Sequence, residues 1–380
     1  MNILVLSWRD PKHPMAGGAE QVMHEHMKGW IAAGHKVTFF SSRFPGSKQE
    51  EKLDGVDIVR QGKDLFLGVQ LSAFWWYLFG SHDKFDLVID EFHGIPFFTP
   101  LYVRVPKLAV LQEVAREVWW LNPLPKPFNW IIGWIGYTLE PFLFLFYRDI
   151  PFINKSVPFM TGSQSAKDDL ARMGIKSNDI TIVPHGVIIE TPSKLPPKEK
   201  ENTIVFLGAL TRDKGIEDAL RAFAILSKNG NDNLLWIIGV GISNYVTHLK
   251  KLSRRLGIEG KIKFFGFVSQ KEKFELLARA HVLINPSIRE GWGLVNIEAN
   301  RMGTPVVAYR SPGLVDSVKD GQSGVVCKVN TPGNLSREIE KILSSPQTYK
   351  TFQYGSRRWA SQFNWEKSKK LSLKLLENIK

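Results

Sequence analysis

Apolar and polar positions follow two alternating patterns from the start of the chain. An apolar run over residues 2–8 has the length of a buried strand, and a glycine-containing loop follows it over residues 9–20. Apolar side chains then recur at helical spacing over residues 19–34, where Gly34 suits a C-cap. A second apolar run covers residues 35–42. The pattern predicts a strand, a glycine loop, a helix and a strand.

The same alternation continues to the middle of the chain and then stops. A short helix is predicted over residues 163–174, because serines that can cap its start precede a terminal glycine. Segment 188–202 has three prolines, many charges and no apolar period, which is typical of a linker. Further strands of the first half are predicted over residues 85–91, 107–113, 158–163 and 180–186.

After the linker the alternation restarts. A strand is predicted over residues 203–209, a loop over 210–215 and a helix over 216–230. Residues 366–380 have the pattern of an amphipathic helix that can pack back on the first half. Later strands are predicted over residues 233–241, 261–269, 281–287, 304–310 and 324–329.

Strands that alternate with helices in both halves predict parallel sheets with right-handed crossovers. The predicted fold class is therefore α/β, with two Rossmann-like, doubly wound domains in tandem. We expect a first domain at residues 1–187, a linker at 188–202, a second domain at 203–362 and a C-terminal helix at 363–380. In this architecture ligands bind at the carboxyl ends of the strands, here in the cleft between the two domains.

Length and composition agree with two globular domains, because 380 residues exceed one ordinary core and 43% of them are hydrophobic. The formal net charge of +13 favours phosphate-rich partners, namely nucleotides, nucleic acid or an anionic membrane. Cys327 is the one cysteine, which fits a reducing compartment. The first ten residues have no basic segment of a signal peptide. We therefore expect a cytoplasmic protein.

No clean transmembrane span is predicted. The most apolar stretch covers residues 130–148, but it contains Glu140 followed by Pro141. The two apolar halves on either side are each too short to cross a bilayer. We interpret this stretch as a buried or interfacial element.

Two carboxylates frame a glycine-rich turn in the sequence REGWGLVNIEAN, residues 289–300. Glu290 falls in the loop after a predicted strand, and Glu298 falls about one turn into the helix that follows. Gly291 and Gly293 let a ligand approach the backbone, and a helix N-terminus suits a phosphate. Beside an anion, fixed carboxylates make sense as acceptors for neutral hydroxyls. An ordinary turn with two solvated glutamates has the same spacing.

Two further loops have residue types that suit phosphate. Arg212 and Lys214 precede a predicted helix at Gly215, where cations could clamp a diphosphate. A basic surface loop has the same composition. Gly17 and Gly18 lie between the first strand and first helix, the usual phosphate or acceptor position of such a domain, and we expect them to contribute to donor binding. A tight turn is the alternative, and the chain lacks the G-x-G-x-x-G of dinucleotide sites.

These features in this order resemble the GT-B fold retaining glycosyltransferases of family 4, over almost the whole chain. The motifs that carry the resemblance are GGAE, VPHGV, FLGALTRDKGIEDAL, IIGVG, KIKFFGFVSQKEKFELLARAHVLINPS, REGWGLVNIEA, GTPVVAY, DGQSGVVC and FNW. The resemblance implies transfer of a hexose from a nucleoside diphosphate sugar, of UDP or GDP. It implies an acceptor-binding first domain and a donor-binding second domain. It requires neither a metal nor another cofactor.

The resemblance also implies roles for single residues. Glu290 would hold hydroxyls of the donor sugar, and Glu298 would hold the ribose. Arg212 and Lys214 would neutralise the leaving diphosphate, whose charge grows as the glycosidic bond breaks. The family's favoured mechanism is a front-face route in which the leaving phosphate takes the acceptor proton. Backbone amides would contact the sugar and the diphosphate at Gly291, Trp292, Gly293 and Leu294.

The chain departs from the family pattern at several positions. Ala209 stands where the family commonly has arginine, three residues before Arg212. The family often has a histidine near the C6 hydroxyl of the sugar, where this chain has Gln112 and Glu113. His93 is another candidate for that region, although a lone histidine is more often structural. Another departure is His185, which replaces the family's asparagine before a glycine and which we expect to be structural.

The first domain also contains segments rich in aromatic and basic residues, at 74–79, 116–136 and 142–148. Such residues favour the membrane interface and anionic headgroups. We therefore expect a lipid-linked or cell-envelope acceptor and an enzyme bound peripherally to the cytoplasmic membrane face. Core helices of a large domain are the alternative.

Two other functions remain open from the sequence. A sugar-nucleotide epimerase can share the twin-domain architecture, although the carboxylate pair of residues 289–300 argues against it. The positive charge alone would suit a nucleic-acid-binding protein, but no recognition motif is present and we expect no nucleic-acid partner.

Overall fold

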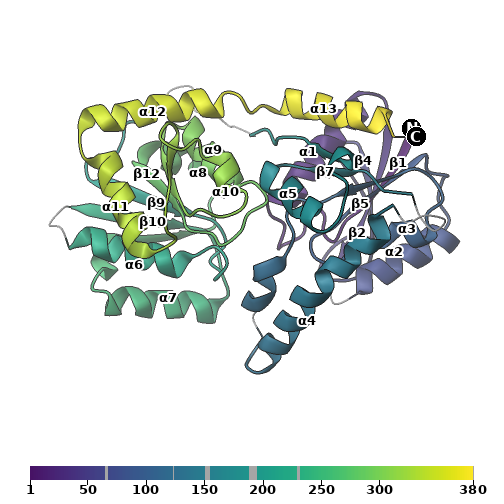
Figure 1. Cartoon of the computed structure of the whole chain (residues 1–380), viewed down its shortest axis with the longest axis horizontal. Helices are drawn as coiled ribbons and strands as arrows, with labels where there is room; N and C mark the ends of the chain where they lie inside the picture. Colours follow the sequence, from purple (N-terminus) through teal and green to yellow (C-terminus); the bar gives the residue numbers. More distant parts are fainter. Residues whose placement is uncertain (65–66, 123, 150–154, 188–194, 229–231, 380) are drawn as a thin grey trace. The chain divides into compact units, whose positions relative to one another are not determined.

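The computed structural model describes residues 1–64, 67–122, 124–149, 155–187, 195–228 and 232–379. The chain divides into two compact units (Figure 1). The first unit consists of Met1–Gly186 with Trp365–Lys380, and the second consists of Val187–Asn364. Each unit has a wholly or mostly parallel sheet with alternating helices, so the predicted α/β fold class is confirmed.

The sheet of the first unit has the strand order β3-β4-β2-β1-β5-β6-β7-β8. Its strands are β1 (Asn2–Leu6), β2 (Lys36–Arg43), β3 (Glu50–Leu53), β4 (Val56–Lys63), β5 (Leu87–Glu91), β6 (Lys107–Val110), β7 (Phe159–Thr161) and β8 (Ile180–Ile182). Its helices are α1 (Gly18–Ala32), α2 (Gly68–Phe79), α3 (Thr99–Tyr102), α4 (Phe128–Leu143), α5 (Gln164–Arg172) and α13 (Trp365–Glu377), with short 3₁₀ turns η1 (Arg116–Leu121), η2 (Phe144–Tyr147) and η3 (Ser177–Asp179).

The outer hairpin of this sheet corrects the expectation of purely parallel pairing. Strand β3 pairs antiparallel with β4, whereas the other strand pairs of the sheet are parallel. The two strands are joined by Asp54 and Gly55, which both have positive φ, 49° and 89°. An Asp-Gly pair with this conformation suits a two-residue hairpin, and antiparallel neighbours need no crossover.

Alternation along β1 shows how the first sheet buries both of its faces. Ile3 and Val5 pack in one cluster with Trp30 of α1 and Leu376 of α13. Their neighbours Leu4 and Leu6 pack in another cluster, which includes residues of α2. Successive side chains of a strand point to opposite faces, so an uninterrupted apolar run is the pattern of a strand covered on both sides.

The C-terminal helix α13 packs on α1 of the first unit. Ser372 is central to this contact, because its hydroxyl lies 3.0 Å from Nδ1 of His26 and accepts from Nε1 of Trp30 at 3.1 Å. Lys369 adds an ion pair with Glu25 at 2.7 Å. The tail of the chain is therefore part of the first unit's structure.

The second unit has a six-stranded parallel sheet of order β11-β10-β9-β12-β13-β14. Its strands are β9 (Asn202–Leu207), β10 (Asn233–Ile238), β11 (Ile262–Gly266), β12 (Val282–Asn285), β13 (Val306–Ala308) and β14 (Gly324–Val326). Its helices are α6 (Ile216–Ser227), α7 (Ser243–Arg255), η4 (Glu259–Lys261), α8 (Gln270–Arg279), α9 (Leu294–Arg301), α10 (Leu314–Ser317), α11 (Pro332–Leu343) and α12 (Pro346–Ala360).

The predicted linker 188–202 overlaps this second unit. Residues 188–194 lie outside the described residues. Beyond them, Lys198 is half-buried and donates to the carbonyl of Ala280 at 2.5 Å and to Oγ1 of Thr304 at 2.7 Å. Burial lowers the pKa of Lys198 to about 7. The described end of the predicted linker is thus packed against the second unit.

The apolar stretch 130–148 differs from its expectation, because Pro141 does not divide it. Helix α4 includes Pro141 and continues directly into η2. The combined segment Phe128–Tyr147 has 20 residues and a mean hydropathy of 1.2, so it is long and apolar enough to cross a membrane by length and composition. A proline inside a helix removes one backbone hydrogen bond, which here does not end the helix.

Candidate active site

Three strands of the second sheet end at a glycine or are followed by one. No side chain projects from the backbone at these positions of the sheet's carboxyl edge. Gly208 follows β9, Gly239 follows β10, and Gly266 ends β11. The N–H of Gly239 donates to the carbonyl of Gly266 at 2.9 Å. A Cβ added to Gly208 or Gly266 would meet nothing within 4 Å, whereas one on Gly239 would collide with the carbonyl of Gly208. This edge therefore has room for a ligand against the main chain, where doubly wound sheets bind their ligands.

Glu290 and Lys214 meet at the same edge. Glu290 lies in the loop between β12 and α9, and its Oε1 accepts from Nζ of Lys214 at 2.9 Å. The same oxygen accepts from the hydroxyl of Ser287 at 2.9 Å. The side chains of Glu290 and Lys214 keep 19% and 25% of their surface exposed. The carboxylate is therefore held in place and still open to a ligand.

The two loops that carry this pair are locked together through their backbones. The N–H of Ile288 donates to the carbonyl of Asp213 at 2.8 Å. Gly215 has φ of +70°, and a Cβ on it would lie 2.1 Å from the carbonyl oxygen of Pro286. A Cβ on Gly313 would likewise lie 2.1 Å from the carbonyl oxygen of Glu290. Glycines at these positions set the distance between the lysine and the glutamate.

Helix α9 begins at the glycine-rich turn. Gly293 is its N-cap, with φ of +81°, and the described residues place no side-chain cap on the helix. Its first N–H groups are therefore available to a ligand with negative charge. The side chain of Trp292 is buried and packs edge-on against Phe363 at 4.8 Å. Trp292 could thus contact a donor only through its backbone.

Glu298 lies on α9 and forms an ion pair with Lys273 of α8, with 2.5 Å between Nζ and Oε1. Both side chains are mostly buried, with 11% and 14% of their surface exposed. A mostly buried carboxylate needs a compensating charge, and Lys273 supplies it. This partner was not predicted from the sequence.

The second predicted cation differs from Lys214. Arg212 is exposed, and within the described part of the chain no ion pair of its side chain was found. Ala209, where the family commonly has arginine, is also exposed. Arg212 is thus available to a phosphate, and its substitution for the family's arginine stays a prediction.

Two family models match the chain. The model described as "Glycosyl transferases group 1" matches residues 187–359, and the model described as "Glycosyltransferase Family 4" matches residues 16–191. The chain belongs to these glycosyltransferases. The resemblance inferred from the ordered motifs is therefore confirmed.

Individual relatives and solved structures align with nearly the whole chain. Glycogen synthase of Mycobacterium tuberculosis (strain CDC 1551 / Oshkosh) is 23% identical over 414 residues, which cover 96% of this chain and 92% of that protein. WaaG, a glycosyltransferase involved in lipopolysaccharide biosynthesis, superposes with a TM-score of 0.76 at 16% identity and 100% coverage of both chains. Anabaena Alr3699/HepE in complex with UDP-glucose has a TM-score of 0.74 at 17% identity, again with 100% coverage of both. The structural likeness confirms the GT-B architecture.

The candidates of the first unit lie at the carboxyl edge of its own sheet. Gly17 and Gly18 begin α1, and the N–H of Gly17 donates to Oε2 of Glu20 at 2.7 Å. His93 follows β5, is 46% exposed and has Nε2 3.8 Å from Oε1 of Glu113. This distance is too long for a direct hydrogen bond. The glycosyltransferase thus has polar side chains at the edge where an acceptor would be expected.

Gln112 forms a different contact from the one expected of it. Its Oε1 lies 2.9 Å from Nε2 of His185, and both residues follow strands that end earlier than predicted. His185 is buried, and burial lowers its pKa to about 4. A neutral histidine that holds Gln112 fits the structural role expected for His185.

Glu91 is a polar residue that the sequence analysis missed. It ends β5, only 6% of it is exposed, and the described residues give neither carboxylate oxygen a hydrogen bond of normal geometry. Burial and the nearby charge of Glu20 raise the pKa of Glu91 to about 8. A carboxyl kept neutral at the ligand edge of the first sheet is a functional candidate. The signal was an acid at the end of the apolar run LVIDE.

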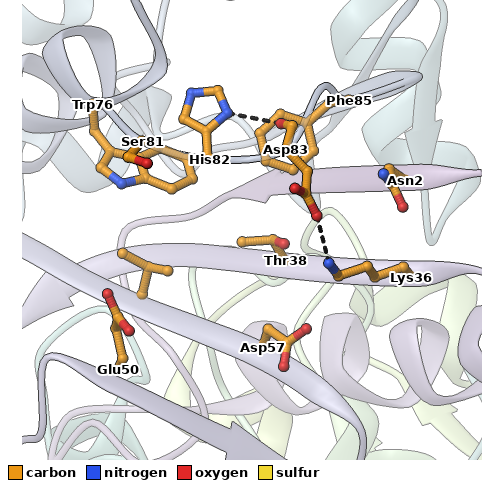
Figure 2. Close-up of a pocket in the computed structure, with 11 residues that line it drawn as sticks. Asn2, Lys36, Thr38, Glu50, Asp57, Trp76, Ser81, His82, Asp83 and Phe85 are labelled. Atoms are coloured by element: carbon orange, nitrogen blue, oxygen red, sulfur yellow. Dashed lines mark hydrogen bonds and ion pairs between the residues drawn. The ribbon is translucent and has the colours of Figure 1, made fainter. Parts of the chain in front are cut away.

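A cavity lies elsewhere in the first unit (Figure 2). It measures about 270 Å³ and is lined by residues near the amino ends of the strands, including Asn2, Lys36 and Asp57. Lys36 and Asp83 form an ion pair across it at 2.7 Å. Doubly wound sheets bind ligands at the opposite edge, so this cavity is not the candidate site. Among the described residues no cluster of three or more metal-ligating side chains was found.

Proposed function

We propose that this glycosyltransferase moves a hexose from a UDP or GDP sugar to a glycan or lipid-linked acceptor with retention of configuration. The proposal rests on the Lys214–Glu290 pair at the carboxyl edge of the second sheet. It places a cation and a hydroxyl-binding carboxylate side by side. A diphosphate sugar needs both, one for its leaving group and one for its sugar.

The chemistry follows from charge. The bond between the anomeric carbon and the diphosphate breaks, a bond to the acceptor oxygen forms, and the acceptor proton passes to the leaving phosphate. Negative charge grows on the diphosphate, where Lys214, Arg212 and the N-terminus of α9 would stabilise it. Glu290 has one oxygen bound by Lys214 and Ser287, which leaves the other for sugar hydroxyls.

Donor recognition would continue along α9. Backbone N–H groups from Gly291 to Leu294 would contact the sugar and diphosphate, and Glu298 would accept from the ribose. Lys273 already neutralises Glu298, so its carboxylate would not repel a neighbouring phosphate. The complex of Alr3699/HepE with UDP-glucose supports a nucleotide sugar as donor, because that protein shares this fold.

The acceptor would bind at the carboxyl edge of the first sheet, near Gly17, Gly18 and His93. We propose an acceptor that is lipid-linked or part of a cell-envelope glycan, and an enzyme bound peripherally to the cytoplasmic membrane face. The role of WaaG in lipopolysaccharide biosynthesis supports this acceptor class, since its fold matches over the whole chain. Closure of the site around both substrates would exclude water and limit donor hydrolysis.

Thermal unfolding with UDP, GDP, ADP and their hexose conjugates tests the donor. At a hundredfold excess over Kd, the correct nucleotide adds about 2.7 kcal/mol of stability, which is a clear rise in Tm. Glu298→Ala should lose about half of this rise or more, and Lys341→Ala, which changes an ion pair with Glu338 on α11, should retain it. If no nucleotide raises Tm, the proposed donor site is wrong.

A further inference from the structure

Helix α4 has its apolar and polar faces reversed relative to an ordinary surface helix. Its buried residues are Gly133 and Glu140, one without a side chain and one charged. A run of large apolar side chains faces solvent along α4 and η2, and we name it the apolar face of α4. It consists of Phe128, Trp130, Ile131, Ile132, Trp134, Ile135, Leu139, Phe142, Leu145 and Phe146.

The orientation of α4 is fixed by its polar side. The Glu140 carboxylate accepts from the N–H groups of Ala115 at 2.6 Å and Arg116 at 2.7 Å, and from Nε1 of Trp119 at 3.2 Å. Hydrogen bonds to a buried charge are strong, and rotating the helix would break all three. The exposure of the apolar face is therefore built into the packing.

Glycines complete this attachment. A Cβ on Gly133 would lie 2.7 Å from the ring of Trp120, and one on Gly136 would lie 2.2 Å from the ring of Trp119. The helix thus rests directly on η1, and it extends away from the sheet of its unit (Figure 1). Only 28% of the most apolar stretch within Phe128–Tyr147 is buried, so the described residues leave most of this segment uncovered.

Charge at the two ends of the segment indicates what would cover it. Between Lys126 and Arg148 the chain has one charged residue, the inward-facing Glu140. Lys126 is exposed and lies 5.0 Å from the ring of Trp130. Arg148 is half-buried and its guanidinium donates to the carbonyl of Met173, so Lys126 is the cation that faces solvent here. An apolar helix with tryptophans and a cation at its end is typical of segments at the boundary between headgroups and acyl chains.

We propose that α4 lies in the surface of an anionic phospholipid bilayer, with its apolar face among the acyl chains of one leaflet and Lys126 among the headgroups. This inference rests on the proposed function, because the bilayer would present a lipid-linked acceptor to the first unit. A spanning helix would have to leave η1 and expose the Glu140 carboxylate to lipid, which is strongly unfavourable. The helix therefore lies on the membrane and does not cross it.

Other apolar side chains of the first unit would join this contact. Helix α2 exposes Leu71 at 57%, Trp75 at 59% and Phe79 at 72% of their surface. Scattered apolar residues are ordinary on protein surfaces, but two helices of one unit with large exposed aromatic residues are not. Attraction of the net charge of +13 to anionic lipid would strengthen the contact at low salt.

Co-sedimentation of the full chain with vesicles tests the proposal. Vesicles of phosphatidylglycerol and phosphatidylcholine should bind it, and pure phosphatidylcholine should bind it at least tenfold less. The triple variant Ile131→Glu, Trp134→Glu, Leu139→Glu should lose tenfold or more of the binding, since all three are exposed. Val329→Glu, an equally exposed apolar position of the second unit, is the control and should bind like the wild type.

Two results would overturn the proposal. One is unchanged vesicle binding of the triple variant, with unchanged thermal unfolding. The other is a wild-type protein that does not bind vesicles and is a dimer in sedimentation velocity, whereas the triple variant is a monomer. A second copy of the chain, and not a membrane, would then cover α4. Nucleotide-induced stabilisation of the same variant separates this question from the donor site. It should persist, and its absence in the wild type would contradict the proposed function instead.

Discussion

Lys214 and Glu290 are 76 residues apart in the sequence, and their charged groups lie 2.9 Å apart in the structure. Neither residue is informative alone, since each has an ordinary role as a surface charge. Their contact depends on Gly215, which lets its loop approach the carbonyl of Pro286. The pair is the most specific feature of the candidate site, and the predictions for the donor begin from it.

Lys214→Ala should lower kcat by about 10²–10³-fold, because a cation that meets developing charge acts mainly in the transition state. The KM for the donor should change less than tenfold. Steady-state kinetics with the nucleotide sugar that stabilises the protein measures both. Lys214→Arg should recover part of kcat, and Lys341→Ala should leave it unchanged. A raised KM with an unchanged kcat would show that Lys214 only binds the ground state.

Glu298→Ala should remove the preference for a ribonucleotide over its 2′-deoxy analogue. The loss of hydrogen bonds to a charged acceptor corresponds to about 1.5–3 kcal/mol, or roughly ten- to a hundredfold in Kd. Isothermal titration with both nucleotides measures the preference. Lys273→Ala is the informative companion, because it breaks the same ion pair but keeps the carboxylate. If both variants lose the preference equally, the ion pair and not the ribose contact explains the effect.

Gly215→Ala should weaken donor binding without contacting the donor. The residue has φ of +70°, and its Cβ would collide with the carbonyl of Pro286, so the loop of Lys214 must shift. We expect a fall in Tm together with loss of nucleotide-induced stabilisation. Gly333→Ala on α11 is the matched control, since nothing lies within 4 Å of its Cβ position. That control should be neutral or stabilising by about 0.4–1 kcal/mol.

The repeated α/β pattern could be predicted well from the sequence. Strands that are buried on both faces appear as apolar runs, and glycine-containing loops and segments of helical periodicity separate these runs. It failed where a local signal was overlooked, as at Asp54 and Gly55, whose hairpin places an antiparallel strand on the edge of the first sheet. It also failed at Pro141, where composition suggested a break and the helix continues. Hydrogen bonds from the backbone of Ala115 and Arg116 to Glu140 hold that segment in place. These contacts join distant parts of the sequence, so the local sequence pattern could not predict them.

The candidate site divides in the same way. Residue types in the loops predicted Lys214 and Glu290, because phosphate and hydroxyl recognition need a cation and a carboxylate. Lys273 could not be predicted, since its contact with Glu298 joins two helices through the fold. Glu91 could not be distinguished from Asp90 in the sequence LVIDE. The structure separates them, because Asp90 accepts from Thr99 and Phe97, whereas Glu91 has only the Ser7 hydroxyl near it among the described residues and accepts no hydrogen bond of normal geometry.

Glu91 gives the glycosyltransferase a predictable dependence of stability on pH. Its pKa is about 8 in the folded protein, above its ordinary value of 4.5, because burial and Glu20 disfavour the charged form. The unfolded chain releases this proton near pH 4.5, whereas the folded chain retains it until about pH 8. Stability from this group is therefore complete below pH 4.5 and is lost as pH rises through about 8.

Glu91→Gln removes this titration and keeps the size of the neutral side chain. The variant and wild type should have similar Tm values near pH 5, and the variant should become relatively more stable as pH approaches 9. Buried His26 and His185, whose pKa values are lowered, affect both proteins equally and cancel in the comparison. Thermal unfolding of the two proteins at closely spaced pH values measures the difference. Parallel curves between pH 5 and 9 would mean that Glu91 is charged in the folded protein and has a cation or solvent beside it.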